Sequence, residues 1–338
     1  MASILVTGCA GFIGSHLCEQ LLSQGHRVSG LDNFDPFYDR TIKEQNMAGF
    51  ATHPLFSFHE LDLHQGAEAL ADALPAERLD LVVHLAAKAG VGPSVRQPIA
   101  YLEANVVGTA QLLEWMRLRG IGKLFLASSS SVYGNTRELP FREDMPLLQA
   151  CISPYAASKL ACEQLTYTYH HLYQLNVLNA RFFTVYGPRQ RPDLAIHKFV
   201  QLLRAGQPIP VFGDGTTARD YTFVLDTVDG IGRGIDYLLG HEQVYETINL
   251  GNKRPVQLLD LIRTIGQAVG REPQLAFHPM QAGDVDVTYA DIRKAEQLLG
   301  YAPQTTLAAG IRQFVAWLDE QHPSQPTLPA AAQPAAAL

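Results

Sequence analysis

The chain has 338 residues, of which 47% are hydrophobic and 17% are charged, so it can bury a sizeable core in one large or two modest domains. The formal net charge of −7 argues against a nucleic-acid partner held by general electrostatics, and no apolar run approaches the length of a membrane span. Cys9, Cys18, Cys151 and Cys162 lack C-x-x-C spacing, which predicts neither disulfides nor a metal site. We expect a cytoplasmic protein without a signal peptide.

The first predicted elements are a strand, a glycine-rich turn and a helix. Ser3 to Thr7 reads as a short buried strand, and Gly8-Cys9-Ala10-Gly11-Phe12-Ile13-Gly14 follows it and opens the amphipathic stretch Ser15 to Gln24. Glycines at such a turn let backbone amides and a helix N-terminus approach a pyrophosphate. The pattern predicts a dinucleotide-binding loop. Its expected contacts are Gly8, Gly11, Phe12, Ile13 and Gly14.

The second predicted strand ends in a carboxylate. His26 to Leu31 is an apolar run followed by Asp32, about 20 residues beyond the loop, where a carboxylate can accept from both ribose hydroxyls of an adenosine. Because a 2'-phosphate would meet that negative charge, the sequence favours NAD over NADP. Arg40, nearby in the sequence, speaks the other way.

Strands and helices alternate through the first half, which predicts a doubly wound parallel sheet. Phe56 to Leu63 is the third predicted strand, and its end at Asp62 and Leu63 lies where an adenine ring could be received. Leu79 to Ala87 is a nearly continuous apolar run, typical of a central strand covered on both faces. Lys88 follows at the sheet edge where ligands collect, so a cofactor contact and an ordinary surface lysine both fit.

A long helix and a fifth strand come next. Tyr101 to Arg117 has the apolar bulk of a helix with Asn105 facing inward, and with a second helix it could present a flat apolar face for dimerisation. Lys123 to Ser128 predicts the fifth strand, which runs into the serine-rich turn Ser128 to Gly134. A hydroxyl at the end of a strand can bond a sugar oxygen and relay its proton, although such a turn often has no function. Ser129 is the hydroxyl that we expect to face the pocket.

Tyr155 and Lys159 are four residues apart, so they lie one turn apart on the same face of a predicted helix. The ammonium can then lie beside the phenol oxygen and favour its ionised form. Ser153 can cap this helix and Pro154 suits its first position, which places Tyr155 in the first turn, where the helix dipole also favours a phenolate. Taken alone, the pair could equally be a half-buried Tyr and an exposed Lys on an ordinary helix.

Together these motifs resemble one family. The motifs are Gly8-x-x-Gly11-x-x-Gly14, Asp32, His84-Leu85-Ala86-Ala87, Asn105, the serine run and Tyr155-x-x-x-Lys159. They are similar to the extended short-chain dehydrogenases/reductases, in the nucleotide-sugar epimerase and dehydratase branch, over residues 3 to 318. The resemblance implies an α/β fold with a Rossmann-type, NAD-binding, doubly wound parallel sheet and a smaller α/β C-terminal domain for a nucleoside diphosphate sugar, usually in a homodimer. It also implies a catalytic triad of Ser129, Tyr155 and Lys159.

The same resemblance suggests where the domains and the cofactor lie. We expect residues 1–180, with 223–243 returning, in the NAD-binding domain, and residues 181–222 and 244–322 in the sugar-nucleotide domain. Residues 323–338 are rich in Pro and Ala and predict a disordered tail. Beyond the glycine loop, the residues expected at NAD are Asp32, Asn33, Asp62, Leu63, Leu85, Ala86, Ala87, Lys88, Asn105, Tyr155 and Lys159.

The serine run narrows the reaction. A 4,6-dehydratase must eliminate water from C5 and C6, and that family pattern carries an Asp-Glu pair immediately before Val-Tyr-Gly, where this chain has Ser130 and Ser131. A UDP-glucuronate decarboxylase also keeps a Glu in this turn. The site lacks the group for elimination, which favours epimerisation at C4. Tyr155 would take the C4 hydroxyl proton while hydride moves to NAD, and both would return to the other face of the 4-keto sugar.

The substrate end of the chain is locally cationic. The segment from Arg181 to Asp220 contains six Lys and Arg residues and three Asp residues. This excess of positive charge suits the binding of a diphosphate. By resemblance, Arg219 contacts the nucleotide phosphate, and Val211 and Phe212 line the uracil and ribose. Arg189 and Arg191 are further candidates, of which we assign Arg191 to the substrate.

Three stretches look most like the UDP-glucuronate 4-epimerases: Arg181 to Pro188, Arg191 to Asp193, and His278 to Asp284. The neutral hydroxyls that would hold the sugar carboxylate are those of Ser128, Ser130, Ser131 and Thr184. Neutral donors supply no proton that would encourage decarboxylation.

Three departures and several alternatives remain. Gln281 stands where UDP-galactose 4-epimerases carry a phosphate-binding Arg, which speaks against plain UDP-glucose, and Val224-Leu225-Asp226 replaces the usual Val-Asp-Asp. Gly92-Pro93-Ser94 lacks the Arg that often follows Ala-Gly-Val in glucuronate epimerases. A UDP-glucose/UDP-galactose 4-epimerase and a UDP-glucuronate decarboxylase are alternative enzymes on the same frame. A non-catalytic NAD-binding scaffold or sensor is the alternative outside enzymes. Toward the end of the chain, Phe223 to Leu239 should return to the first domain and Tyr245 to Leu250 should re-enter the second.

Overall fold

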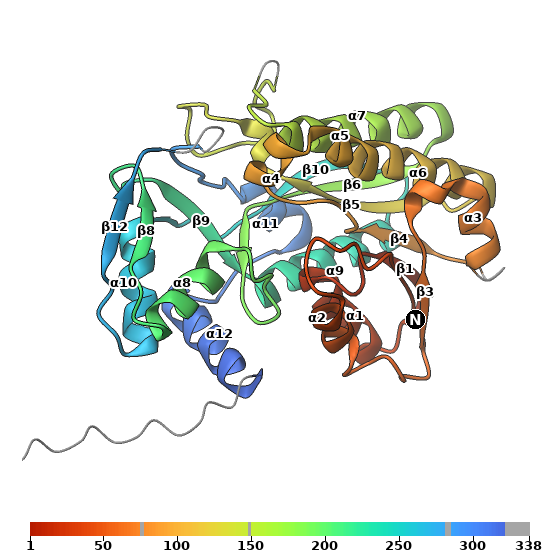
Figure 1. The fold of residues 1–338 in the computed structure, drawn as a ribbon. Coiled ribbons are helices and arrows are strands. Elements are labelled where there is room, and N and C mark those ends of the chain that lie inside the picture. Colours follow the sequence, from red (N-terminus) through yellow and green to blue (C-terminus); the bar gives the residue numbers. More distant parts are fainter. Residues whose placement is uncertain (75–77, 148–149, 281–284, 322–338) are drawn as a thin grey trace, which may run out of the picture.

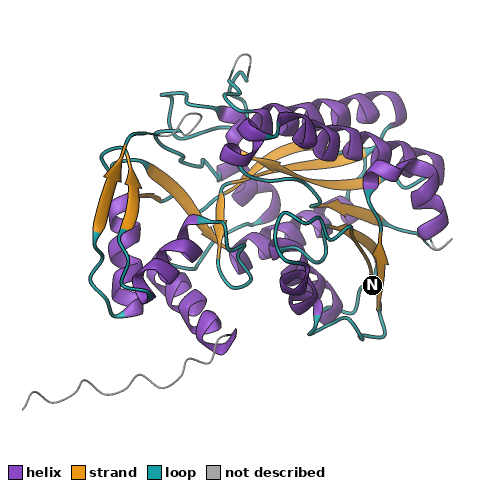
Figure 2. Ribbon diagram, in the orientation of Figure 1, coloured by secondary structure: helices purple, strands orange, loops and turns teal. Residues whose placement is uncertain are grey.

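The computed structural model describes residues 1–74, 78–147, 150–280 and 285–321. The tail expected at 323–338 and the end of the His278 to Asp284 stretch lie outside these ranges. A larger lobe, with helices on both faces of a sheet, lies beside a smaller one (Figure 1). Figure 2 shows helices on both sides of the strands of the larger lobe, whereas two strands of the smaller lobe lie at the outer left edge of the molecule.

A seven-stranded parallel sheet forms the centre of the larger lobe, in the order β10-β6-β5-β4-β1-β2-β3. Its strands are β1 Ser3–Thr7, β2 Arg27–Asp32, β3 Phe56–Glu60, β4 Leu81–His84, β5 Lys123–Ser129, β6 Asn176–Phe182 and β10 Tyr245–Leu250. All four residues of β4 are buried, as a strand covered by helices on both faces should be. The predicted doubly wound, Rossmann-type sheet is confirmed.

Helices cover both faces of this sheet (Figure 1). On one face lie α1 Phe12–Ser23, α2 Arg40–Met47 and α9 Val224–Gly240. On the other lie α3 Gly66–Ala73, α4 Val91–Arg96, α5 Pro98–Leu102, α6 Gly108–Arg119 and α7 Pro154–Tyr173. The strand order reverses between β1 and β4, and ligands of doubly wound sheets bind where the order reverses, beyond the carboxyl ends of the strands.

The smaller lobe contains two short sheets. The first has the order β11-β9-β7, from β7 Thr184–Tyr186, β9 Ala218–Phe223 and β11 Pro255–Gln257. The second pairs β8 Ile209–Phe212 with β12 Leu275–His278. The accompanying helices are α8 Ala195–Arg204, α10 Leu258–Val269 and α12 Leu307–Gln321, while α11 Arg293–Leu299 packs on α9 and β10.

Two apolar cores hold these layers. One lies between the sheet and the α3, α6 and α7 face, and includes Leu5, Leu112 and Trp115. The other begins on the α1 and α9 face and continues into the smaller lobe, from Val6 to Phe314. Because the second core is continuous, burial of apolar surface stabilises the contact between the lobes.

Two elements differ from the sequence-based expectation. Tyr245 to Leu250, expected to re-enter the second domain, is β10 and pairs with β6 at the edge of the large sheet. The reason is that α9 packs on β5 and β6, and a helix covering a parallel sheet leads into a neighbouring parallel strand. The helix expected from Tyr101 to Arg117 is interrupted by a π-helical turn, Glu103–Val107, between α5 and α6. This turn carries Asn105.

Candidate active site

The glycine turn between β1 and α1 is tight, because Gly8 and Gly14 lie where a side chain would meet protein backbone. Gly8 has a φ of +74°, and a Cβ there would lie 2.9 Å from the Ala86 amide nitrogen. A Cβ on Gly14 would lie 2.1 Å from the Gly8 carbonyl oxygen. Gly11 is the N-cap of α1 and forms no side-chain cap, so the first amides of the helix have no side-chain partner from this residue. Such a helix N-terminus binds anions such as a pyrophosphate.

The carboxyl ends of β1, β2, β3 and β4 meet at one edge of the sheet, because these strands are neighbours and parallel. The predicted cofactor residues that follow these four strands are Gly8, Gly11, Phe12, Ile13, Gly14, Asp32, Asn33, Asp62, Leu63, Leu85, Ala86, Ala87 and Lys88. The topology therefore gathers residues that are up to about eighty positions apart in the sequence.

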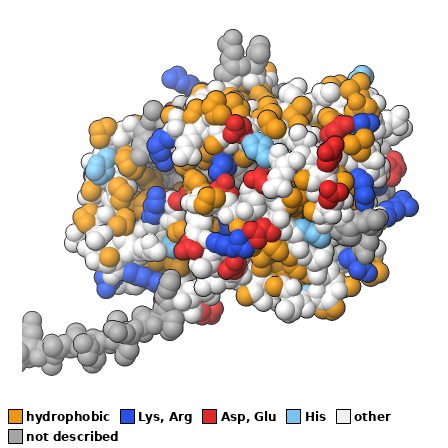
Figure 3. All heavy atoms as spheres, turned by 45° about the vertical axis from the view of Figure 1, so that its right-hand side comes forward, with side chains coloured by type: hydrophobic (Ala, Val, Ile, Leu, Met, Phe, Trp, Pro, Cys, Tyr) orange, Lys and Arg blue, Asp and Glu red, His pale blue; other side chains and the backbone are white. Residues whose placement is uncertain are grey.

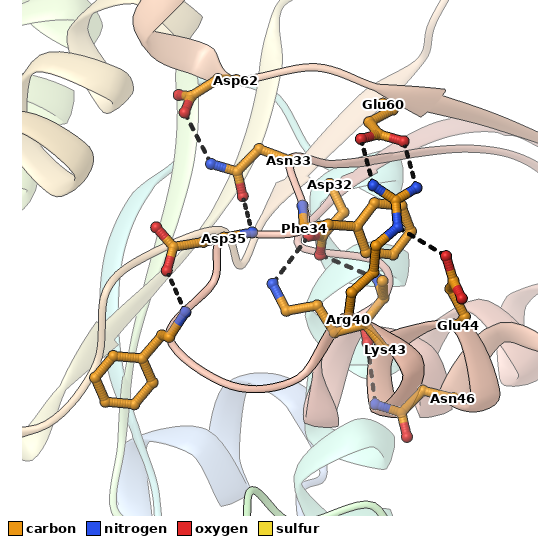
Figure 4. Close-up of polar contacts among 12 residues, drawn as sticks. Asp32, Asn33, Phe34, Asp35, Arg40, Lys43, Glu44, Asn46, Glu60 and Asp62 are labelled. Carbon is orange, nitrogen blue, oxygen red and sulfur yellow. Dashed lines mark hydrogen bonds and ion pairs between the residues drawn. The ribbon is translucent and has the colours of Figure 1, made fainter.

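Asp32 ends β2 with both carboxylate oxygens in use (Figure 4). Oδ2 accepts from the Ala10 amide at 3.3 Å, and Oδ1 accepts from the Phe34 amide at 2.9 Å and from Lys43 Nζ at 3.3 Å. Asp32 and Lys43 are both buried. Lys43 lies on α2, and the sequence did not single it out because nothing local distinguishes it from other helical lysines. Asn33 donates to Asp62 at 2.9 Å and so links the ends of β2 and β3.

Arg40, which spoke for NADP in the sequence, is held by two carboxylates (Figure 4). Its Nη1 and Nη2 donate to the two oxygens of Glu60 at 2.8 Å, and its Nε donates to Glu44 at 2.7 Å. The guanidinium also lies 4.2 Å from the centre of the Phe34 ring. A 2'-phosphate would have to compete with both glutamates for this cation.

Lys88 and Asn105 connect the loop after β4 with the loop after β2 and with α7. Lys88 Nζ pairs with Asp35 at 2.7 Å. Asn105 Oδ1 accepts from the Lys88 amide at 2.8 Å, and its Nδ2 donates to the Lys88 carbonyl at 3.0 Å and to Ser158 Oγ at 2.9 Å. The inward position expected for Asn105 is confirmed, since the residue is 1% exposed. We call the sheet edge at the carboxyl ends of β1, β2, β3 and β4, where the predicted cofactor residues lie, the cofactor edge. The side-chain amide of Asn105 connects this edge with α7.

Helix α7 begins as its sequence predicts and carries the tyrosine and lysine. Ser153 Oγ accepts from the Ala156 amide at 3.2 Å, and Pro154 occupies the first turn. Lys159 is 5% exposed, and its Nζ donates to the Ala127 carbonyl at 2.8 Å, near the end of β5. The Tyr155 ring lies edge-on to the Tyr101 ring, with 6.2 Å between centroids. Because Lys159 is buried, the alternative interpretation from the sequence, in which Lys159 is an ordinary exposed lysine, is wrong.

The serine run spans the end of β5, whose last two residues are Ser128 and Ser129. Ser129 Oγ accepts from the Ser131 amide and donates to Ser131 Oγ, each at 3.2 Å. Ser130 and Ser131 begin the short 3-10 helix Ser130–Tyr133. Ser128, by contrast, donates its hydroxyl proton to Glu163 Oε1 at 2.5 Å and is 3% exposed. That proton is therefore not available to a substrate oxygen in this structure.

A buried ion pair lies behind the serine run. Glu163 Oε1 and Oε2 accept from Arg181 Nε at 3.0 Å and Nη2 at 2.7 Å, and both side chains are at most 5% exposed. Arg181 Nη1 also donates to Tyr133 Oη at 2.9 Å. From the sequence, Arg181 was one of the basic residues expected to bind a diphosphate. The structure corrects this prediction, because its guanidinium is buried and hydrogen-bonded to Glu163 and Tyr133. Glu163 lies one turn beyond Lys159, a spacing that could have drawn attention to it.

The arginines that follow have different roles. Arg189 Nη2 pairs with Glu19 of α1 at 2.6 Å, which joins the smaller lobe to the cofactor-side helix. Arg191 binds Asp193 through two hydrogen bonds of 2.9 and 2.8 Å and donates to the Ala89 carbonyl at 3.1 Å. Its guanidinium is 5.0 Å from the centre of the Phe37 ring. Arg191 thus lies beside two loops at the cofactor edge, whereas Arg189 is anchored to α1.

The remaining predicted substrate residues belong to the smaller lobe. Thr184 begins β7. Val211 and Phe212 end β8, where Val211 is buried and the Phe212 ring lies 5.5 Å from the His278 ring. Arg219 on β9 donates to the Ala218 carbonyl at 3.0 Å and to the Asp286 carbonyl at 3.3 Å.

His84 is a buried titratable group between the cofactor edge and α7. Thr109 Oγ1 donates to the Asn105 carbonyl, so it can only accept from His84 Nε2 at 3.0 Å. Nδ1 then accepts from Thr7 Oγ1 at 2.7 Å, and the imidazole is neutral. Burial, with Lys159 as a second cause, lowers the pKa of His84 to about 3.

Within the described ranges, no group of three or more His, Cys, Asp or Glu side chains could hold a metal ion. None of the helices in these ranges has the length and hydropathy that crossing a bilayer requires.

Comparison with known proteins identifies the family. Residues 5–314 match the family described as GDP-mannose 4,6 dehydratase. The chain belongs to this family, the extended short-chain dehydrogenases/reductases that the motifs resembled. A UDP-glucuronate 4-epimerase of Thermodesulfobacterium geofontis is 39% identical over 321 residues, which cover 95% of this chain and 97% of the relative.

Two solved structures show the same architecture. The UDP-glucuronic acid 4-epimerase of Bacillus cereus, in complex with UDP-glucuronic acid and NAD, is 34% identical with a TM-score of 0.87, over 95% of this chain and 100% of that one. The UDP-glucose 4-epimerase of Thermotoga maritima, with UDP-glucose, is 28% identical with a TM-score of 0.82, over 94% and 99%.

The depressed pKa of His84 predicts a pH-dependent loss of stability. An unfolded histidine titrates near 6.5, so between about 6.5 and 3 the unfolded chain binds a proton that native His84 refuses, and the free energy of unfolding falls as the pH falls. From pH 6.5 to 5 this one group accounts for about 2 kcal/mol. Urea unfolding of His84→Asn should therefore show a loss over this interval that is smaller by about that amount.

His171→Asn is the matched control, because His171 is exposed on α7. It should lose stability with falling pH as the unmodified protein does. Parallel pH curves for His84→Asn and the unmodified protein would show that His84 is protonated in the native state.

Proposed function

We propose that this protein is an NAD-dependent 4-epimerase of a UDP-sugar, with UDP-glucuronate interconverted with UDP-galacturonate as the preferred reaction. The observation that carries the proposal is the attachment of α7, the helix that contains Tyr155, to the end of β5, where the buried Lys159 donates to the Ala127 carbonyl two residues before Ser129. The relatives and solved structures named above, which are UDP-sugar 4-epimerases, support the same reaction.

The cofactor edge fits NAD. Gly8 and Gly14 allow the tight turn between β1 and α1, since a Cβ at either would meet protein backbone, and the uncapped N-terminus of α1 suits the pyrophosphate. Asp32 would accept from the adenosine ribose, with Lys43 holding its Oδ1. Bound NAD would supply a hydride acceptor and donor opposite C4 of the sugar. Arg40 is engaged by Glu44 and Glu60, which favours NAD over NADP.

Proton transfer falls to Tyr155. Its phenolate would take the C4 hydroxyl proton and return it to the other face, and Lys159, whose ammonium is buried, would stabilise the negative charge. Ser129 would bond the C4 oxygen and orient it toward the phenol. Lys159 is itself oriented by the Ala127 carbonyl, so the residue does not depend on the substrate for its position.

The carboxyl group nearest the serine run does not provide acid catalysis. Glu163 accepts hydrogen bonds from Nε and Nη2 of Arg181 and from the Ser128 hydroxyl, so both of its oxygens are engaged as acceptors inside the protein. Ser130 and Ser131 stand where a dehydratase carries Asp and Glu. These features favour epimerisation over dehydration and over decarboxylation.

The substrate preference rests on neutral donors. The hydroxyls of Ser130, Ser131 and Thr184 would hold a sugar carboxylate without donating a proton to the reacting centre. Arg191, which contacts the Ala89 carbonyl and the Phe37 ring in two loops at the cofactor edge, would contact the substrate from the side opposite these hydroxyls. Gly92 and Pro93 stand where many glucuronate epimerases carry an arginine, which favours UDP-glucose as the second candidate substrate.

We further propose a homodimer built on the α5, α6 and α7 face. Exposed apolar side chains on these helices include Ile99 (64% exposed), Leu118 (63%) and Leu172 (58%). Figure 3 shows hydrophobic side chains along the upper edge of the molecule, where Figure 1 places α5 and α7. A monomer seldom leaves such side chains uncovered on neighbouring helices.

The four free cysteines, three of them buried, suit a reducing cytoplasm, which is where we place the protein. The net charge of −7 gives no reason to expect a nucleic-acid partner.

Product analysis tests the reaction and the substrate together. Purified protein is incubated separately with UDP-glucuronate and UDP-glucose, and the sugars are followed by NMR. We expect UDP-galacturonate from the first and a much slower reaction with the second. Conversion of UDP-glucose alone would shift the assignment to the second candidate, a UDP-pentose product would indicate decarboxylation, and no product from either would refute the epimerase.

Tyr155→Phe tests the acid–base group within the same assay. Loss of the phenol oxygen should lower kcat by about 10²-fold to 10⁴-fold, while NAD stays bound as judged by absorbance of the released nucleotide. Tyr167→Phe, on the exposed side of α7, should leave kcat unchanged. Near-normal turnover by Tyr155→Phe would refute the assigned role.

Sedimentation velocity tests the dimer. A charge at Ile99 would be buried unpaired in the proposed interface, so Ile99→Glu should sediment as a monomer under conditions in which the unmodified protein is a dimer. Leu225→Glu, at an exposed apolar position on α9, is the control and should remain dimeric. Dimeric Ile99→Glu would place the interface elsewhere.

A further inference from the structure

We propose that Ser128 is a positioning residue that does not bind substrate: its hydroxyl joins the end of β5 to the buried carboxylate of Glu163 and thereby fixes Ser129 opposite Tyr155. The proposal rests on the 4-epimerase reaction proposed above. It replaces the expectation that Ser128 is one of the hydroxyls that hold the sugar carboxylate.

The direction of one hydrogen bond carries the first step. Ser128 Oγ donates to Glu163 Oε1 at 2.5 Å, and both residues are 3% exposed. A serine hydroxyl has one proton, so this hydroxyl can only accept from any further partner. A sugar carboxylate is also only an acceptor. The two cannot form a hydrogen bond while the Ser128 hydroxyl proton is directed at Glu163.

Glu163 cannot easily turn away from the Ser128 hydroxyl. Its carboxylate is gripped by Nε and Nη2 of Arg181. Arg181 is fixed in turn, because Nη1 donates to Tyr133 Oη, and Tyr133 donates to Asn249 at 2.7 Å. A buried ionised pair held in this way would lose several favourable contacts if either partner moved.

The position of Glu163 on α7 carries the second step. Tyr155, Lys159 and Glu163 are spaced four residues apart, so all three lie along one face of the helix. Lys159 Nζ holds the Ala127 carbonyl at 2.8 Å, and Glu163 holds the next residue of β5, Ser128. Two consecutive residues of the strand are thus attached to the helix that carries the tyrosine, immediately before Ser129.

The two attachments differ in what they can do for the reaction. Lys159 is one of the proposed catalytic residues. Glu163 and Ser128 would act indirectly, by holding the end of β5 and thereby positioning Ser129. Without the Ser128 hydroxyl the strand end keeps the Lys159 bond but loses the second attachment. A shift of about 1 Å between Ser129 and Tyr155 is enough to slow a proton transfer by as much as 10²-fold.

The test is Ser128→Ala, which removes the hydroxyl and leaves the Glu163–Arg181 pair intact. Thr166→Ala is the matched control: Thr166 is a fully buried residue on α7, three residues beyond Glu163, and its hydroxyl is hydrogen-bonded to the Glu163 carbonyl and to Asn179. Both variants lose one buried hydroxyl next to Glu163, but only the first removes the hydrogen bond between Glu163 and β5. kcat and KM for UDP-glucuronate, bound NAD and thermal unfolding are measured for each.

A positioning role predicts that Ser128→Ala lowers kcat at least 10-fold, with KM changed less than 3-fold and NAD retained, while Thr166→Ala keeps kcat within 3-fold. A raised KM in Ser128→Ala would mean that the hydroxyl binds substrate. An unchanged kcat, or an equal loss of kcat in Thr166→Ala, would mean that the attachment to Glu163 has no specific role. Each of these results overturns the proposal. Absence of epimerase activity in the unmodified protein would instead refute the proposed function.

Discussion

The arrangement of the proposed active site depends on the hydrogen bonds that hold α7 against the end of β5. Tyr155 and Lys159 lie on the helix, Ser129 lies on the strand end, and hydrogen bonds from Lys159 and to Glu163 join the two elements at Ala127 and Ser128. Neither element could arrange the three side chains alone. The reacting geometry is therefore a property of a helix–strand contact that lies inside the core of the larger lobe.

Two buried ion pairs lie on opposite sides of this contact. Glu163 with Arg181 lies behind the serine run, and Asp32 with Lys43 lies at the ribose end of the cofactor edge. Burying charges costs free energy that the attraction between them only partly offsets, so such pairs are a poor way to gain stability. Here Lys43 holds the carboxylate of Asp32, which we propose binds the cofactor, and Arg181 holds Glu163, which binds Ser128 next to the proposed catalytic Ser129. Orientation, more than stability, accounts for their presence.

Much of this arrangement was predictable from sequence. The strand and helix pattern, the cap at Ser153, the inward face of Asn105 and the expected cofactor residues at the carboxyl ends of β1 to β4 follow from local periodicity and from the rule that parallel strands collect ligands at one edge. These features depend on short-range pattern or on topology. A single sequence contains both kinds of information.

The rest could not be predicted, because it depends on pairing across the fold. Arg181 looked like a phosphate ligand, since the sequence shows its charge but not Glu163 eighteen positions earlier, on a helix packed over its strand. Arg189 is spent on Glu19 of α1 for the same reason, and Lys43 gains its role only because α2 packs near the end of β2. Placement of Tyr245 to Leu250 failed because a local pattern does not state which sheet a strand joins.

The central claim is that one carbon of the sugar is oxidised and then reduced from its other face within a single site. The most direct measurement follows deuterium at C4 of UDP-glucuronate by mass spectrometry and NMR. The account predicts that the epimer keeps the label at C4 in ordinary water, and that unlabelled substrate gains none at C4 in heavy water. Loss of the label to solvent during epimerisation would contradict it.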